Sequence, residues 1–89
     1  LERVERTIQL SQAQINQGNL AFSAKEYAKA LDSYQEASRL YPQLANAYIR
    51  QGDTLLKLKR PAEAFTAFQK GVELQPGLLN SKKFAKQYN

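Results

Sequence analysis

The chain contains two similar stretches, and they decide its fold. Residues 11–42 read SQAQINQGNLAFSAKEYAKALDSYQEASRLYP, and residues 45–76 read ANAYIRQGDTLLKLKRPAEAFTAFQKGVELQP. With an offset of 34 residues, ten of the 32 aligned positions are identical, where chance would give roughly two. A period of this length is typical of helix–turn–helix repeats.

Each stretch is expected to form two helices. In the second stretch, apolar residues at helical spacing predict a first helix over about residues 44–58. Pro61 suits the first turn of a second helix, which ends before Pro76. In the first stretch, the first helix is expected to end near Ala24, and the second to cover about residues 27–40. Because β-branched residues are few, the sequence favours an all-α fold over strands.

Small residues recur at fixed places in both stretches. Gly18 and Gly52 fall in mid-helix, where Gly costs about 1 kcal/mol relative to Ala. This cost is tolerable where a neighbouring helix must approach closely, and the expected partner helices carry matching small and aromatic residues: Ala30, Ala64, Tyr34 and Phe68. The alternative is a flexible hinge at each Gly. The common spacing favours close packing.

These residues resemble the tetratricopeptide repeat family, whose pattern is W-x2-L-G-x2-Y, then A-x3-F, then P. The Gly is matched by Gly18 and Gly52, the A-x3-F element by Ala30 with Tyr34 and Ala64 with Phe68, and the Pro by Pro42 and Pro76. The sequence departs from the pattern at the early Trp (Gln14, Tyr48), at the Leu before the Gly (Gln17, Gln51) and at the turn Gly (Lys25, Lys59). The resemblance implies antiparallel helix hairpins stacked as a short right-handed α-superhelix of about five helices.

The expected organisation follows from the repeat. Residues 11–44 form repeat 1, residues 45–78 form repeat 2, and residues 79–89 form a capping helix. Repeat arrays need such a polar-faced terminal element for solubility, although a truncated third repeat is the alternative. Residues 1–10 are expected to extend the first helix backwards. Apolar residues recur every three or four positions in this segment. They form either a stripe that packs within the molecule or a short coiled-coil seam.

The resemblance implies that the first helix of each hairpin lines a concave groove. Repeat 1 would supply Gln12, Ile15, Asn16, Asn19, Phe22 and Ser23, repeat 2 would supply Asn46, Ile49, Arg50, Asp53, Leu56 and Lys57, and the closing helix Asn80, Lys83 and Gln87. Carboxamide side chains can bond to the backbone of an extended peptide, and Arg50 and Lys83 can pair with carboxylates. The alternative is that these polar residues are ordinary solvated surface.

Composition excludes several kinds of chemistry. The chain has neither Cys nor His, so thiol chemistry and the commonest general base and metal ligand are missing. No constellation of acids supports catalysis or a metal site, and no cofactor or small-molecule substrate is expected. The net charge of +5 either keeps the domain soluble or suits a partner with acidic groups. No apolar run is long enough for a transmembrane segment.

The sequence therefore predicts a non-enzymatic adaptor or scaffold segment that binds a protein or peptide in its groove. The runner-up is a structural module that self-associates, for example as a homodimer, through its terminal helices. An RNA- or membrane-associated role driven by the basic charge is the weakest alternative, and nucleic acid is not the expected partner. A cytoplasmic location is only a default. Because the chain begins without Met, a fragment of a larger protein is also considered.

Overall fold

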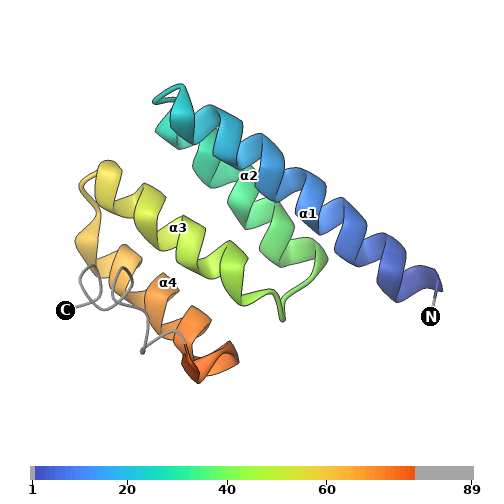
Figure 1. The fold of residues 1–89 in the computed structure, drawn as a ribbon. Helices are drawn as coiled ribbons and strands as arrows, with labels where there is room; N and C mark the ends of the chain where they lie inside the picture. The colour runs from blue at the N-terminus through green and yellow to red at the C-terminus, as the bar shows by residue number, and fades with distance from the viewer. Residues whose placement is uncertain (1, 78–89) are drawn as a thin grey trace.

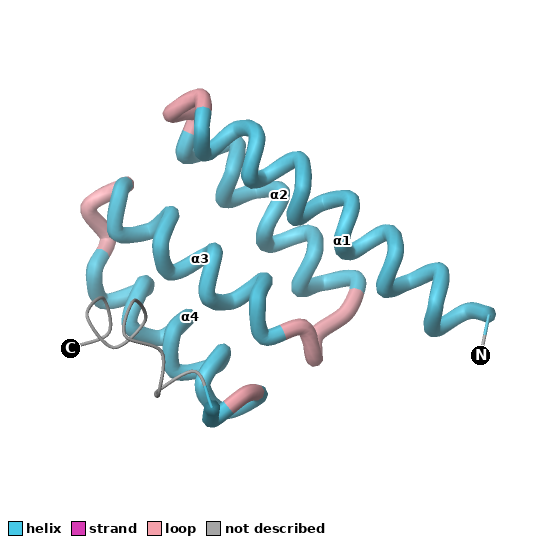
Figure 2. The backbone as a smooth tube through the Cα atoms, in the orientation of Figure 1, coloured by secondary structure: helices cyan, strands magenta, loops and turns pink. Residues whose placement is uncertain are grey.

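The computed structural model describes residues 2–77, which fold into four helices. These are α1 (Glu2–Ser23), α2 (Tyr27–Leu40), α3 (Ala45–Lys57) and α4 (Pro61–Leu74). Figures 1 and 2 show two antiparallel hairpins side by side, with α1 and α2 in the first and α3 and α4 in the second. The prediction of an all-α fold is confirmed, since residues 2–77 contain no strand. The fifth helix expected over residues 79–89 lies outside the described residues.

The turn inside each hairpin has the same geometry. Lys25 and Lys59 both adopt a left-handed backbone conformation, with φ of 64° and 61°. At the end of α1, the N–H of Glu26 donates to the carbonyl of Ala21, and the N–H of Lys25 donates to that of Phe22. This pair of bonds is a Schellman motif, which satisfies carbonyls that the helix end leaves without partners. The repeat-family pattern places Gly at this position because Gly adopts positive φ without strain.

Close packing within each hairpin depends on the two mid-helix glycines. A Cβ atom on Gly18 would lie 2.5 Å from Cε1 of Tyr34, and a Cβ on Gly52 would lie 2.5 Å from Cε1 of Phe68. An aromatic ring of the second helix therefore lies against the bare backbone of the first. The expected close approach is present at both glycines, and the hinge alternative is not needed.

The two hairpins are joined through α2 and α3. Ala47 of α3 is fully buried in a core cluster with residues of α1 and α2, and Leu31 of α2 belongs to the core cluster of the second hairpin. Gln51 of α3 donates hydrogen bonds from Nε2 to the carbonyl of Tyr34 (3.3 Å) and to Oγ of Ser38 (3.0 Å). This interface is both apolar and polar, and it fixes the hairpins relative to each other.

The first turns of α1 extend past the end of α2. Ser11 is the first fully buried residue of α1, and its hydroxyl donates to the carbonyl of Ala37 near the end of α2 (2.9 Å). Nearer the N-terminus, Ile8 is half-buried and Val4 is 52% exposed. Figure 1 shows this end of α1 projecting from the hairpin. No helix within residues 2–77 is long and apolar enough to cross a membrane.

Candidate functional site

The groove residues expected from the sequence have different exposures. Six of them present exposed side chains, namely Gln12, Asn16, Ser23, Asn46, Leu56 and Lys57. Another five are half-buried, namely Asn19, Phe22, Ile49, Arg50 and Asp53. On α1 and on α3 the polar members recur at helical spacing, so each set lies on one side of its helix. Lys83, Asn80 and Gln87 lie outside the described residues.

One of these residues, Asn19, bonds to a buried hydroxyl, and two others, Arg50 and Asp53, act on that hydroxyl electrostatically. Tyr34 is fully buried, and its hydroxyl donates a 2.5 Å hydrogen bond to Oδ1 of the half-buried Asn19 on α1. Burial raises the pKa of the Tyr34 phenol, Arg50 lowers it by a smaller amount, and Asp53 raises it again. Arg50 and Asp53 on α3 are therefore close enough to influence the Tyr34 hydroxyl. Residues of both hairpins meet here, and we call Asn19, Tyr34, Arg50 and Asp53 the polar junction.

Two apolar residues predicted to line the groove pack on the core, and Ile15 is fully covered there while Ile49 is covered only in part. Ile15 is only 2% exposed and is part of the first core cluster. Ile49 packs on the second core cluster, and its Cδ1 occupies the space where a Cβ on Gly71 would stand. Both residues lie at the edge of the apolar side of their helices. The helix α2 packs over Ile15, and the helix α4 packs against Ile49. The Ile15 side chain is therefore not available to a partner, whereas Ile49 is only half-buried.

Phe22 has a structural contact of its own. Its ring packs edge-on against the ring of Tyr27, with centroids 5.2 Å apart, and it also contacts the first core cluster. Such an edge-to-face pair is a favourable arrangement of two aromatic rings. Phe22 therefore stabilises the start of α2, and only part of its surface remains for a partner.

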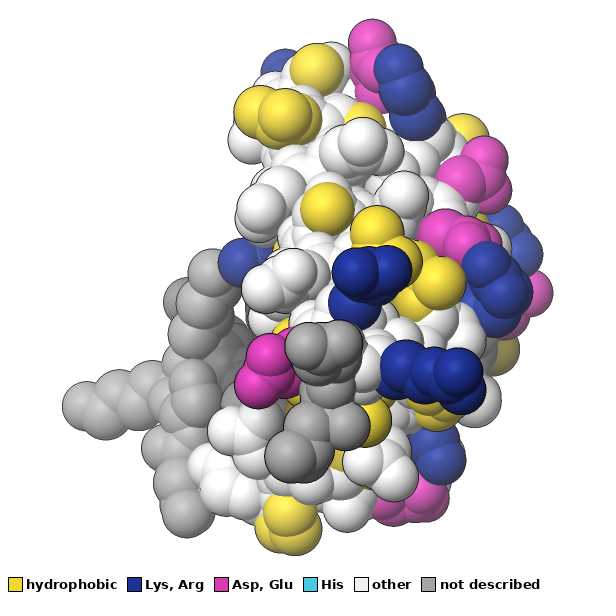
Figure 3. All heavy atoms as spheres, turned by 90° about the vertical axis from the view of Figure 1, so that its right-hand side faces the viewer, with side chains coloured by type: hydrophobic (Ala, Val, Ile, Leu, Met, Phe, Trp, Pro, Cys, Tyr) yellow, Lys and Arg dark blue, Asp and Glu magenta, His cyan; other side chains and the backbone are white. Residues whose placement is uncertain are grey.

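Charges of both signs are mixed on the surface of the described residues. Figure 3 shows Lys and Arg side chains next to Asp and Glu side chains along one edge of the visible face, with hydrophobic side chains scattered between white regions. Among the described residues, ion pairs join Arg39 to Glu36 on α2, and Arg60 to Glu63 at the start of α4. In residues 2–77, no group of three or more Asp and Glu residues is arranged to hold a metal ion.

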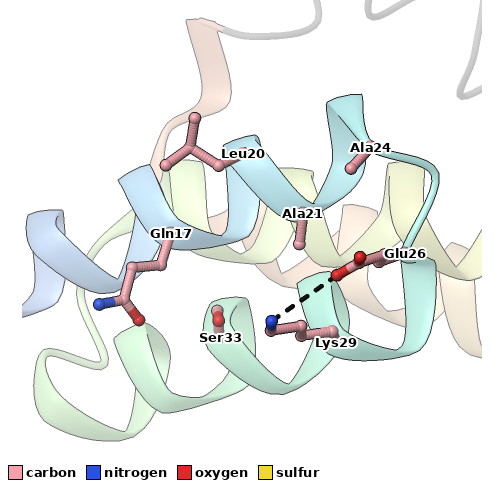
Figure 4. A pocket seen from close by; sticks show the side chains of 7 residues that line it. All are labelled: Gln17, Leu20, Ala21, Ala24, Glu26, Lys29 and Ser33. Atoms are coloured by element: carbon pink, nitrogen blue, oxygen red, sulfur yellow. Dashed lines mark ion pairs between the residues drawn. The ribbon is translucent and has the colours of Figure 1, made fainter.

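A pocket that the sequence reasoning missed lies on the other side of the first hairpin, away from α3 (Figure 4). It has a volume of about 340 Å³. Its lining residues come from α1 and α2 and from the turn between them: Gln17, Leu20, Ala21, Ala24, Glu26, Lys29 and Ser33. Lys29 and Glu26 form an ion pair of 3.7 Å at its rim. The only sequence signal for this surface was the identity of Gln17 with Gln51 in the repeat alignment.

Comparison with known proteins agrees with the repeat and the hairpin geometry. A search of curated proteins finds no significant match. A family profile described as "Tetratricopeptide repeat" matches residues 9–76, which include both hairpins. Members of this family are generally protein–protein interaction modules and are typically not enzymes. Since the match covers most of the chain and the four helices form two stacked hairpins, the chain belongs to the tetratricopeptide repeat family.

Proposed function

We propose that the chain binds a peptide or a helix of another protein, bearing acidic groups, on the side formed by α1 and α3. The observation that supports this best is the polar junction. It combines the cationic Arg50 with the amide of Asn19, whose orientation is fixed by the hydrogen bond from the buried Tyr34. A site built on rigid helices can hold its side chains in one geometry before a partner arrives.

The exposed residues on either side extend this site. Gln12 and Asn16 lie on the same side of α1 as Asn19, and Asn46 and Lys57 lie on the same side of α3 as Arg50. Carboxamides both donate and accept hydrogen bonds, so they can satisfy the backbone of an extended peptide. Arg50 and Lys57 add positive charge that can pair with carboxylates of the partner. Asp53 sets a limit on how acidic the central part of that partner can be.

Asn19 contributes to the proposed site through its amide NH2 group. Its Oδ1 already accepts the bond from Tyr34, which fixes the orientation of the side chain. The two N–H donors of the amide therefore point away from Tyr34. A peptide carbonyl or carboxylate is the group that they can bind.

A peptide array followed by solution titration tests this proposal. Acidic peptides selected on the array should bind wild-type protein, and Arg50→Glu should weaken binding by about tenfold or more because it reverses a charge inside the site. Asn16→Ala, at a fully exposed position, should weaken binding without changing the folded state. Lys70→Glu is the matched control, since it changes the net charge equally but lies on exposed α4 surface.

Equal loss of binding in Lys70→Glu and Arg50→Glu would mean that only the overall charge attracts the peptide, and this would refute the site. Indifference of binding to Arg50→Glu would refute it as well. Steeply salt-dependent binding of oligonucleotides, with no peptide binding, would instead favour nucleic acid as the partner.

A further inference from the structure

The side of α1 that faces away from the core carries a row of exposed residues at helical spacing. Leu10 is 52% exposed and Leu20 is 73% exposed, so both leucines are open to solvent. Ala13 and Gln17 lie between them and are exposed as well. Because the intervals are three and four residues, all four lie on one side of the helix. We call Leu10, Ala13, Gln17 and Leu20 the outer row of α1.

The second hairpin shows what the central residues of this row can hold. The residues 34 positions after Ala13 and Gln17 are Ala47 and Gln51 on α3. Ala47 is fully buried where α2 packs on α3, and Gln51 is 9% exposed and donates a hydrogen bond to the carbonyl of Tyr34 on α2. The residue types that receive a helix on α3 are thus presented to solvent by α1.

The outer row is complementary to a reversed copy of itself. Leu10 stands five residues before Ile15 and Leu20 five residues after it, and Ala13 and Gln17 stand two residues before and after it. In two antiparallel copies of α1 with a two-fold axis at the level of Ile15, each Leu10 therefore faces Leu20 of the other copy. Each Ala13 faces Gln17 of the other copy in the same way. A two-fold interface requires this reciprocity of facing residues.

The first turns of α1 give such a pair the length that it needs. The helix α1 has 22 residues and α3 has 13, since α1 begins nine residues before Ser11, the equivalent of the first residue of α3. These nine residues add about 13 Å of helix. In the antiparallel register, residues 6–13 of one copy face residues 17–24 of the other, which supply the α1 side of the pocket in Figure 4. The first turns of each copy thus lie along the pocket of the other.

Charge also favours the antiparallel direction. Arg3 and Arg6 are exposed on the first turns of α1. In this register, Arg6 reaches the level of Ala24 in the other copy, beside the exposed Glu26 at the rim of the pocket. The C-terminal end of a helix also attracts cations, and the last turn of α1, which lies within the described residues, contains no basic residue. A parallel pair would instead place the arginines of the two copies next to each other.

We propose that two copies of this chain form a symmetric dimer through the outer rows of α1, which pack antiparallel. Leu10 of each copy enters the pocket of the other beside Leu20, and the small Ala13 lets the two helices approach closely. The polar junction lies outside this interface, so each copy keeps its proposed peptide site. A dimer with two such sites binds a partner that carries two matching segments more tightly than one copy does.

Analytical ultracentrifugation from micromolar to millimolar concentration tests the dimer. The mean mass should rise towards that of two chains and then level off, because a two-fold interface closes on itself. Leu20→Glu should raise the dissociation constant by at least about tenfold, since it places a charge in an apolar contact. Gln12→Glu is the matched control, as it makes the same charge change at an exposed position on another side of α1. Circular dichroism checks that both variants fold.

Disulfide cross-linking tests the antiparallel register. The chain contains no Cys, so introduced thiols react only with each other. An oxidised mixture of Leu10→Cys and Leu20→Cys should form a disulfide-linked dimer. Each variant alone should not, because the two copies of residue 10 lie ten residues, about 15 Å, apart along the helices, whereas a disulfide requires Cα atoms within about 7 Å. Gln12→Cys mixed with Leu20→Cys is the control and should remain unlinked.

A charge exchange tests the contact near the pocket rim. Arg6→Glu should raise the dissociation constant about threefold, as expected for an exposed ion pair. The double variant Arg6→Glu with Glu26→Arg should return it to near the wild-type value, because opposite charges again face each other.

Four results would overturn the proposal. Two of them are a wild-type protein that stays monomeric over the whole concentration range, and one whose mass continues to rise beyond two chains. Equal weakening by Gln12→Glu and Leu20→Glu would mean that the outer row is not the contact. Cross-linking of Leu10→Cys with itself as efficiently as with Leu20→Cys would exclude the antiparallel register.

Discussion

Gly18 and Tyr34 define how closely the helices of the first hairpin approach each other. A Cβ atom on Gly18 would lie 2.5 Å from Cε1 of Tyr34 and 2.7 Å from its Cδ1. Real Cβ atoms do not come this close to a ring, so the contact requires a residue without a side chain. Gly52 and Phe68 repeat the relationship 34 residues later. The two pairs explain why the aromatic positions of the second helices are almost fully buried.

Gly18→Ala is expected to destabilise the protein although Ala favours helices. The substitution gains about 1 kcal/mol of helix propensity, but the overpacked contact with Tyr34 should cost more, leaving a net loss of about 1–2 kcal/mol. Urea denaturation followed by circular dichroism measures this. Gly77→Ala is the control, because nothing lies within 4 Å of a Cβ at that position. An unchanged or raised free energy of unfolding in Gly18→Ala would contradict the packing described here.

Lys25→Gly is expected to stabilise the protein modestly. Lys25 has a φ of 64°, a conformation that costs a residue with a Cβ about 1–2 kcal/mol. Gly removes this strain but makes the unfolded chain more flexible, so the net gain should be about 0.5 kcal/mol. Lys29→Gly provides the contrast, because it changes the same residue type inside α2 and should cost about 1 kcal/mol. Thermal unfolding measures both variants. If the melting temperature moves in the same direction in Lys25→Gly and Lys29→Gly, strain at Lys25 is not supported.

Gln51→Ala and Gln17→Ala occupy the same repeat position and should behave differently. Gln51 joins α3 to α2 through hydrogen bonds to the Tyr34 carbonyl and the Ser38 hydroxyl. Its removal should cost about 1–3 kcal/mol, because buried groups lose their partners. Gln17 is exposed, so its removal should change stability by less than about 0.5 kcal/mol in dilute, monomeric protein. Equal effects on the free energy of unfolding would mean that the polar contacts between the hairpins contribute little.

Tyr34→Phe is expected to change the response of stability to alkaline pH. Burial raises the pKa of the Tyr34 phenol, so the unfolded chain loses this proton at a lower pH than the folded chain. The resulting stabilisation is complete below the ordinary tyrosine pKa of about 10, and it is lost as pH rises through the higher pKa of the folded state.

Denaturation curves at several pH values test this expectation. The wild type should lose stability above about pH 10 more steeply than Tyr34→Phe does. At neutral pH, the variant should be less stable by about 1 kcal/mol because Asn19 loses a hydrogen bond. Parallel pH profiles for the two proteins would count against a raised pKa at Tyr34.

Much of the fold could be read from residues that act locally. Pro61 and Pro76 mark the start and end of α4, and the bounds predicted for α2 agree with those observed. The candidate site was harder to predict, as Ile15 and Ile49 show. Both have the spacing of groove residues, but the close approach of a second helix buries Ile15 in the core and covers part of Ile49. How deeply a residue at the border of a helix face is covered depends on a neighbour that is distant in the sequence.

The sequence by itself determined the repeat, the hairpins and the family, because glycine, proline and aromatic residues at fixed spacing act through backbone geometry and local packing. Tertiary structure alone decided that Asn19 accepts a hydrogen bond from the Tyr34 hydroxyl, that Arg50 and Asp53 act on the pKa of this hydroxyl, and that Gln51 is buried while Gln17 is exposed. The physical reason is that identical residues in a repeat have identical local surroundings but different neighbours. The second hairpin packs against the first, whereas no helix within residues 2–77 covers the corresponding face of the first hairpin.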